Sequence, residues 1–274
     1  MFYARMLSHT GLFPVEYSFV TVDYEVKGKK QAEGEKEFRL PLNSALGRKI
    51  SLSFTGEIRC VSCGAVTKKS FNQGACYKCF ITLAENDMCI LRPDTCHFHL
   101  GTCREPEWGQ KNCFKKHTVY LANTSGLKVG ITKENPVSKR WVDQGAVQAL
   151  AVYETESRLE AGLIESEYAK FISDKTSWQK MISGNPEKLD LRNEFQKLAE
   201  KVKLDKKLTP LSSDETEIKY PVQEFPKKKV HKKFEPGVTQ SDILVGIKGQ
   251  YLLFESGVMN VRNYEGYSFE IEIH

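Results

Sequence analysis

The segment HTVYLANTSGLKVGIT, residues 117–132, has the pattern of a β-hairpin. An apolar first run is followed by Asn-Thr-Ser-Gly at residues 123–126, which supplies turn chemistry, and residues 127–132 form a second β-prone run. The first run carries Tyr120 and the second carries Lys128. The sequence therefore predicts a hairpin that presents a tyrosine and a lysine.

A helix, a strand and a second helix are expected after this hairpin. Asn135 and Pro136 give a helix-start signal before SKRWVDQ, and Gly145 can end that helix. Residues 146–155, AVQALAVYET, are apolar enough for a buried strand. Residues 156–175 repeat apolar side chains at steps of three and four, which predicts an amphipathic helix. The side chains on that face are Ala161, Ile164, Tyr168, Phe171 and Ile172.

The same segment contains the parts of metal-assisted phosphodiester hydrolysis. A tyrosine phenol can accept or relay a proton if a cation lowers its pKa, and Lys128 lies across the turn from Tyr120. The guanidinium of Arg140 can clamp a phosphate. Glu160 and Glu165 offer carboxylates for a hard divalent ion such as Mg²⁺. Taken singly, each residue is more typical of a surface charge or a core aromatic.

The order of these features resembles the GIY-YIG nuclease superfamily over residues 117–180. TVYLA is similar to its first motif and LKVGIT to its second, with Arg140 at the position of the helix arginine. The resemblance implies that Tyr120 serves as, or relays to, the general base and that Arg140 stabilises charge on the phosphate. It also implies that Glu165 binds one Mg²⁺, with Glu160 as the alternative.

The superfamily pattern is altered at several positions. Lys128 stands where most members have tyrosine, as in some restriction enzymes of the superfamily. Gln144, one helical turn after Arg140, stands where nucleases often carry histidine or tyrosine. The asparagine of the last motif is not evident near Asp174. An inactive or repurposed site is therefore a competing expectation.

The first four of the eight cysteines lie in CVSCGAVTKKSFNQGACYKC, two Cys-x-x-Cys pairs. A two-residue spacer lets both thiolates of a pair reach one ion, and two such turns complete a tetrahedron around zinc. Free thiols or a redox pair are the alternative, but redox Cys-x-x-Cys motifs occur singly. Gly64 follows the first pair, where such a turn commonly needs positive φ. We predict a structural zinc site formed by Cys60, Cys63, Cys76 and Cys79.

The other four cysteines are interleaved with histidines in CILRPDTCHFHLGTCREPEWGQKNC, which begins at Cys89. Free thiols at this density would be prone to oxidation, so a second zinc site is weighed evenly against free thiols. Its ligands would be Cys96, Cys103, Cys113 and one more from Cys89 or a histidine such as His99. The spacing matches no zinc knuckle, and His99 can equally be a polar core residue.

The two ends of the chain have strand patterns. VEYSFVTVDYEV and KISLSFTGEIRC are β-prone and are separated by the polar stretch KGKKQAEGEKEF, and the C-terminal residues 237–274 are β-prone with glycine turns. We expect the strands of both ends to share one sheet or barrel. Residues 186–205 predict an amphipathic helix that begins at Pro186. The following PKKKVHKKFEP is interpreted as a solvated linker, with a patch for an anionic partner as the alternative.

These features predict an α+β fold with a zinc-ribbon-like module followed by a GIY-YIG-like α/β domain. CYKCFITLAENDMC, CHFHLGTCREPEWG and RWVDQGA, with the hairpin, also make the whole chain resemble an uncharacterised bacterial family. That family is a domain of unknown function in which cysteine motifs precede a GIY-YIG-like segment. The expected parts are a β-rich segment (1–55), a cysteine-rich zinc module (56–116), a GIY-YIG-like domain (117–185), a helix and basic linker (186–236) and a β-rich segment (237–274).

The composition is that of an ordinary soluble globular chain, with 274 residues, 40% of them hydrophobic and 27% charged. No apolar run approaches the roughly 18 residues of a membrane span, and the first residues lack signal-peptide features. We therefore expect a cytoplasmic protein. A net charge of +5 favours polyanions only weakly.

Three functions are compatible with the sequence, in this order of preference. The first is a zinc-stabilised protein that binds DNA or RNA through a vestigial nuclease fold. The second is an active Mg²⁺-dependent endonuclease that uses Tyr120, Lys128, Arg140 and Glu165. The third is an interaction module without nucleic acid. The sequence fixes no oligomeric state.

Overall fold

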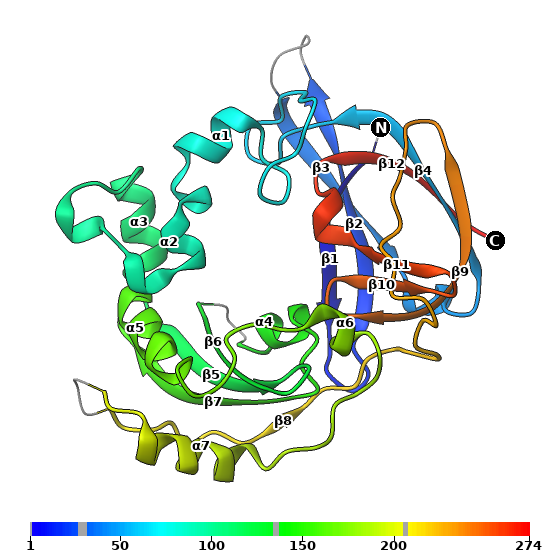
Figure 1. The fold of residues 1–274 in the computed structure, drawn as a ribbon. Helices are drawn as coiled ribbons and strands as arrows, with labels where there is room; N and C mark the ends of the chain where they lie inside the picture. The colour runs from blue at the N-terminus through cyan, green and yellow to red at the C-terminus, as the bar shows by residue number, and fades with distance from the viewer. Residues whose placement is uncertain (1, 27–31, 134–136, 205–207) are drawn as a thin grey trace. The chain divides into compact units, whose positions relative to one another are not determined.

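The computed structural model describes residues 2–26, 32–133, 137–204 and 208–274 (Figure 1). The chain mixes sheets and helices and divides into two compact units. Unit 1 comprises Met1–Thr82 and Lys219–His274, and unit 2 comprises Leu83–Ile218. Within the described residues, no helix has the length and apolar character needed to cross a membrane.

Unit 1 contains one eight-stranded antiparallel sheet with the order β11-β10-β9-β4-β12-β1-β2-β3. The last strand of the chain, β12, pairs with both β1 and β4. This confirms that strands from the two ends of the chain share a sheet. The strands are β1 (Tyr3–Thr10), β2 (Glu16–Val26), β3 (Ala32–Pro41), β4 (Lys49–Ile58), β9 (Thr239–Lys248), β10 (Tyr251–Phe254), β11 (Gly257–Asn260) and β12 (Tyr267–Ile273), and the helical turns are η1 (Asn43–Ala45), α1 (Tyr77–Thr82) and η5 (Val261–Tyr264).

Strand β3 corrects the interpretation of the polar stretch as a simple separator. From residue 32 onward this stretch pairs with β2, in a register that runs from Ser18 opposite Pro41 to Val26 opposite Ala32. Its side chains at 35–39 are exposed. An edge strand is held by backbone pairing and needs no apolar face, so its composition did not reveal it. Residues 27–31 of the stretch lie outside the described residues.

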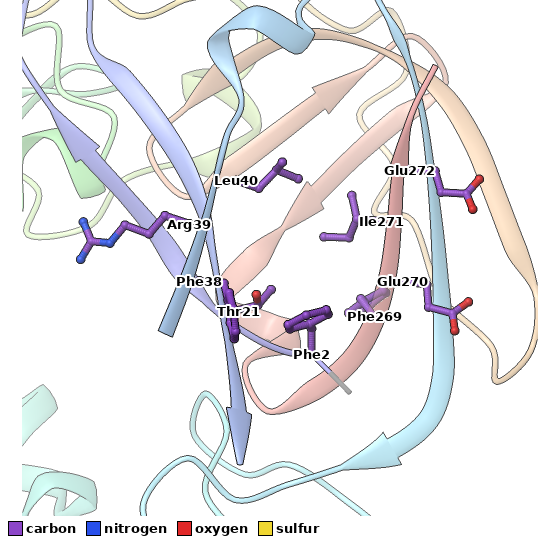
Figure 2. A pocket seen from close by; sticks show the side chains of 9 residues that line it. All are labelled: Phe2, Thr21, Phe38, Arg39, Leu40, Phe269, Glu270, Ile271 and Glu272. Carbon is purple, nitrogen blue, oxygen red and sulfur yellow. The ribbon is translucent and has the colours of Figure 1, made fainter. Parts of the chain in front are cut away.

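An apolar groove with a volume of about 460 Å³ lies along β2, β3 and β12 of this sheet. Figure 2 shows Leu40 and Ile271 extending toward each other across the groove, with the ring of Phe2 between Phe38 and Phe269. The rings of Phe2 and Phe38 meet edge to face at 4.9 Å between centroids. No sequence pattern had indicated this groove.

Unit 2 contains a four-stranded antiparallel sheet with the order β6-β5-β7-β8 (Figure 1). The predicted hairpin is confirmed: β5 and β6 are joined by a turn in which Gly126 adopts a φ of +132°. The predicted buried strand is confirmed as β7. The strands are β5 (His117–Asn123), β6 (Leu127–Thr132), β7 (Gln148–Thr155) and β8 (Thr216–Glu217).

The two faces of this hairpin differ in character. Tyr120 pairs with Gly130, and Ala122 with Lys128, so these four residues share one face. The opposite face packs in the apolar core of unit 2, where burying each large side chain contributes roughly 1.5–3 kcal/mol. Its core members include Val119, Leu121, Val129, Leu150, Val152, Ala161, Ile164, Tyr168, Leu191 and Leu198.

The helices of unit 2 follow the expected order, with shifted ends. The helix expected over 156–175 ends at Tyr168, so Phe171 is exposed and does not extend the apolar face. The helix expected from Pro186 begins at Leu191, because the Asp190 side chain caps it by accepting from the N–H of Asn193 at 2.9 Å. The helical segments are η2 (Ala84–Asn86), α2 (Met88–Leu91), η3 (Pro93–Thr95), η4 (Phe98–Leu100), α3 (Pro106–Cys113), α4 (Ser138–Asp143), α5 (Arg158–Tyr168), α6 (Trp178–Met181) and α7 (Leu191–Lys201).

Helix α4 ends where the sequence indicated. Gly145 adopts a φ of +73°, and a Cβ at this position would lie 2.6 Å from the sulfur of Met181. Only glycine satisfies both the backbone conformation and this close approach. The start signal at Asn135 and Pro136 lies outside the described residues.

Candidate functional site

Four cysteines of unit 1 converge on one point. The sulfur atoms of Cys60, Cys63, Cys76 and Cys79 lie within 4.8 Å of one another, and those of Cys63 and Cys76 are 3.9 Å apart. Zinc–sulfur bonds of about 2.3 Å in a tetrahedron separate the sulfurs by about 3.8 Å. The four residues therefore fit a tetrahedral zinc ion.

Two glycines shape the backbone around this cluster. Gly64, after the first Cys-x-x-Cys pair, adopts a φ of +68°, as predicted. Gly74, before the second pair, adopts a φ of +109°, and a Cβ there would lie 2.4 Å from a methyl group of Val61. Cys76 directly precedes helix α1, and Cys79 lies within it. The turns thus bring two distant pairs of thiols together.

The surroundings of the cluster favour a thiolate at Cys60. Burial alone raises the pKa of this thiol, but backbone N–H groups of Cys76, Cys63 and Ser62 lower it to about 7. The N–H of Cys76 donates to the Cys60 sulfur at 3.1 Å. Burial raises the pKa of Cys79. Because zinc binds thiolates, occupancy should decrease as pH falls.

In unit 2, Tyr120 is enclosed on all sides. Its side chain is 0% exposed, and its phenol donates to Oε1 of Gln144 at 2.8 Å. A Cβ at Gly130 would lie 2.5 Å from the phenol oxygen, so the ring occupies the space that glycine leaves. Burial raises the pKa of Tyr120 to about 12, against the charge and hydrogen bonding of Arg140.

Lys128 is also buried, with 3% of its surface exposed. Burial, followed by repulsion from Arg140, lowers its pKa to about 8, while Glu165 and Asp174 act in the opposite direction. The N–H of Val129 donates to the carbonyl of Ser173 at 2.9 Å, which holds the segment after α5 against β6. This contact brings Asp174 to Lys128.

Glu165, on α5, responds to the same charges. Burial raises its pKa to about 7; Lys128, Arg158 and Arg140 lower it, while Asp174 raises it further. A carboxyl group with a pKa near neutrality, coupled to a buried lysine, is characteristic of functional sites. Tyr120, Lys128, Arg140 and Glu165 are thus brought within electrostatic reach of one another.

The alternative glutamate, Glu160, has a structural role. It takes part in capping α5: the Ser157 hydroxyl accepts from the N–H of Glu160 at 3.2 Å, and Oε2 of Glu160 accepts from the N–H of Glu156 at 3.1 Å. This arrangement starts helix α5. Of the two glutamates, Glu165 is the one coupled to Tyr120 and Lys128.

The second cysteine group lies in unit 2, ahead of β5. Cys89, Cys96, Cys103 and Cys113 line one cavity of about 20 Å³. His97 also lines this cavity, whereas His99 is not among the described residues that do. The ligand atoms of Asp87, Cys89 and His97 lie within 4.8 Å of one another.

The family model described as "Protein of unknown function (DUF2797)" matches residues 47–269. The chain belongs to the DUF2797 family. The match covers most of both units, including all eight cysteines and the four candidate residues of unit 2. No curated protein and no solved structure matches the chain.

Sequence reasoning missed two charged residues of this DUF2797 protein. Asp174 was noted only as the place of a missing asparagine, yet it influences the pKa of both Lys128 and Glu165. Arg158 was not singled out, although burial lowers its pKa while the charges of Cys113, Glu165 and Cys89 oppose that shift. The sequence could have indicated Arg158, because it lies seven residues before Glu165 and residues seven apart share a helix face.

Proposed function

We propose that this DUF2797 protein binds nucleic acid and hydrolyses phosphodiester bonds at the unit 2 site with a divalent cation. One observation carries the proposal. Tyr120, Lys128, Arg140 and Glu165 come from four different elements, and the charges of Arg140 and Glu165 act on the pKa of both Tyr120 and Lys128. Burial shifts the pKa of Lys128 to about 8 and that of Glu165 to about 7. The order hairpin, helix, strand, helix supports the resemblance to GIY-YIG nucleases.

Each side chain has a chemical task in this proposal. Arg140 is partly exposed and also hydrogen-bonds toward Tyr120, and in this proposal its guanidinium binds a phosphate from solvent. Lys128, with a pKa of about 8, is mostly protonated at pH 7 and adds positive charge beneath that phosphate. Tyr120 and Gln144 fix each other through their hydrogen bond and limit how water approaches.

The acidic residues present suit a divalent cation. Glu165 and Asp174 repel each other, since Asp174 raises the pKa of Glu165, and a bound Mg²⁺ would relieve this repulsion. Glu165 would hold the ion, with Asp174 beside it. When bound, Mg²⁺ stabilises negative charge on the reacting phosphate.

A second candidate function is nucleic-acid binding without cleavage. The observation that favours it is the complete enclosure of Tyr120, whose pKa is raised to about 12. A general base must reach the attacking water, and a sealed phenol bonded to Gln144 does not. In this case Arg140 binds the phosphate backbone, the buried charge of Lys128 adds to the attraction, and no bond is broken.

The test is cleavage of single- and double-stranded DNA and RNA by the zinc-loaded protein in Mg²⁺ or Mn²⁺. Glu165→Gln removes the carboxylate, and Glu167→Gln is the matched control, because Glu167 lies on the same helix and pairs with Lys170 at 2.6 Å. We expect Glu165→Gln to reduce cleavage by about 100-fold or more and Glu167→Gln to cleave like the wild type.

Three outcomes separate the alternatives. Equal cleavage by Glu165→Gln and the wild type would contradict the assigned site. Binding that weakens with salt but produces no cleavage would support the second candidate. If the zinc-loaded protein neither binds nor cleaves any of the four substrates, both proposals fail and the interaction module remains.

A further inference from the structure

The cavity of the second cysteine group has the size and lining of an ion site. Its volume of about 20 Å³ accommodates about one water-sized occupant. Cys89, Cys96, Cys103 and Cys113 come from different turns of the segment that precedes β5, yet all four line it. No disulfide joins any of the eight cysteines, all of which lie in the described residues. Four thiols around one ion-sized space match the donor set of a structural zinc site.

The polar neighbours of this cavity are already engaged. Asp87 forms an ion pair with Arg104, whose Nε lies 2.7 Å from Oδ2 of Asp87. The other carboxylate oxygen of Asp87 lies 3.6 Å from Nε2 of His97. The Asp87 side chain also caps α2 by accepting from the N–H of Cys89. Nδ1 of His97 lies 2.8 Å from the hydroxyl of Thr102. These bonds support the turns around the thiols and engage Asp87 and His97, although the ligand atoms of both lie within 4.8 Å of the Cys89 sulfur. The four cysteines are chosen as the ligands because all four line the cavity.

Arg158 supplies a second, independent observation. Its Nη2 donates to the carbonyl of Ile90 at 2.7 Å, and its Nε is buried without a hydrogen-bond partner. Its guanidinium lies close enough to Cys113, Glu165 and Cys89 for their charges to act on it. Four thiolates around Zn²⁺ carry a net charge of −2. Such a centre would compensate the largely enclosed cation of Arg158.

The segment from η2 to α3, which carries the four cysteines, also packs against the core of unit 2. Turn η3 packs against α5 at Gly162, where a Cβ would lie 2.5 Å from the Cβ of Pro93 and 2.7 Å from the backbone N of Asp94. Such close backbone contact requires glycine in the middle of this helix, at a cost of about 1 kcal/mol in helix propensity. Helix α2 and turn η4 bury none of their residues, so this segment has little apolar core of its own and needs another source of rigidity, which a metal ion provides.

We infer that Cys89, Cys96, Cys103 and Cys113 bind a second, structural zinc ion that fixes the segment from η2 to α3 against helix α5. This centre lies in unit 2 and is separate from the zinc site of unit 1. It does not depend on the phosphodiester activity. His99, considered from the sequence as a ligand, is not one in this assignment.

The test is the zinc content of the full-length protein, measured by elemental mass spectrometry. The wild type should hold two zinc ions per chain. Cys113→Ser and Cys76→Ser, one from each group, should each hold one. His97→Gln and His99→Gln should retain two, because neither side chain binds the ion. Cobalt titration of the wild type gives a second measurement that needs no variant: two equivalents should show thiolate-to-cobalt charge transfer.

The assignment has clear points of failure. One zinc ion per wild-type chain, with one cobalt equivalent showing thiolate charge transfer, would overturn it. Two ions retained in Cys113→Ser would also overturn it. Loss of one ion from His97→Gln would show that the histidine, and not four thiols alone, completes the site. If Cys113→Ser does not fold, the cobalt titration of the wild type decides between one centre and two.

Discussion

Replacing Lys128 with methionine should stabilise unit 2 while removing a functional charge. Lys128 is 3% exposed, and burial with repulsion from Arg140 lowers its pKa from 10.5 to about 8. A difference of about 2.5 units, at 1.36 kcal/mol per unit, corresponds to about 3 kcal/mol of destabilisation by the charged amine. Methionine keeps most of the length of the side chain without the charge.

The stability that Lys128→Met gains over the wild type should be large at pH 7 and smaller at higher pH. Below pH 8 the lysine is charged in both the folded and unfolded chain, so the wild type carries the full penalty. Between pH 8 and 10.5 the folded chain releases the proton and the unfolded chain keeps it, so the stability of the wild type rises. Removing Lys128 also leaves Glu165 with less positive charge, which reduces the gain. We expect Lys128→Met to gain about 1–3 kcal/mol at pH 7.

Urea unfolding at pH 7 and near pH 10 measures this difference. Lys170→Met is the control, because Lys170 is exposed in the turn that follows α5 and pairs only with Glu167 among the ion pairs described. It should change stability by less than about 0.5 kcal/mol. A Lys128→Met protein that is less stable than the wild type at pH 7 would refute the reasoning. So would a gain of the same size at both pH values.

Three further changes test other parts of the structure. Gly130→Ala should destabilise unit 2 by about 1–3 kcal/mol in urea unfolding, because the new methyl group would overlap the Tyr120 phenol; an unchanged midpoint would show that the ring is not packed there. Burial lowers the pKa of His117 to about 4, so the free energy of unfolding should fall by up to about 3 kcal/mol between pH 6.5 and 4 as the unfolded chain takes up a proton. His117→Gln should lessen that fall. Parallel pH profiles of stability for the variant and the wild type would contradict this. Cys76→Ser should lower the stability of unit 1 by several kcal/mol, and a variant that melts like the wild type would end the claim of a structural zinc site there.

Local patterns were sufficient for the parts of the fold that depend on neighbouring residues. Alternation along residues 117–132 predicted both strands and the turn of the hairpin, because one face had to be apolar and the turn needed Gly126. The doubled Cys-x-x-Cys spacing predicted the cluster of unit 1, since each pair is bound by local turn geometry. Gly145 correctly marked the end of α4.

Features that depend on contacts between distant parts of the chain could not be predicted from local sequence patterns. Strand β3 pairs with β2 through the backbone, so its mostly polar sequence did not reveal it as a strand. Asp174 reaches Lys128 only because Ser173 bonds to β6, a contact that no local pattern records. Pro186 is a good first residue for a helix, but the side chain of Asp190 provides the cap and the helix starts there. Side-chain capping decided that boundary.

The claim common to both candidate functions is that Arg140 binds a phosphodiester, and direct binding tests it best. The measurement is the affinity of zinc-loaded protein for labelled DNA and RNA in Ca²⁺ at several salt concentrations, comparing the wild type with Arg140→Gln. Arg192→Gln is the control, since Arg192 is an exposed arginine on α7 that bonds to Asp214 at 3.0 Å. We predict that Arg140→Gln weakens binding about 10-fold or more and lowers the salt slope by about one, while Arg192→Gln binds like the wild type. Equal affinity and salt slope for Arg140→Gln and the wild type would contradict the account.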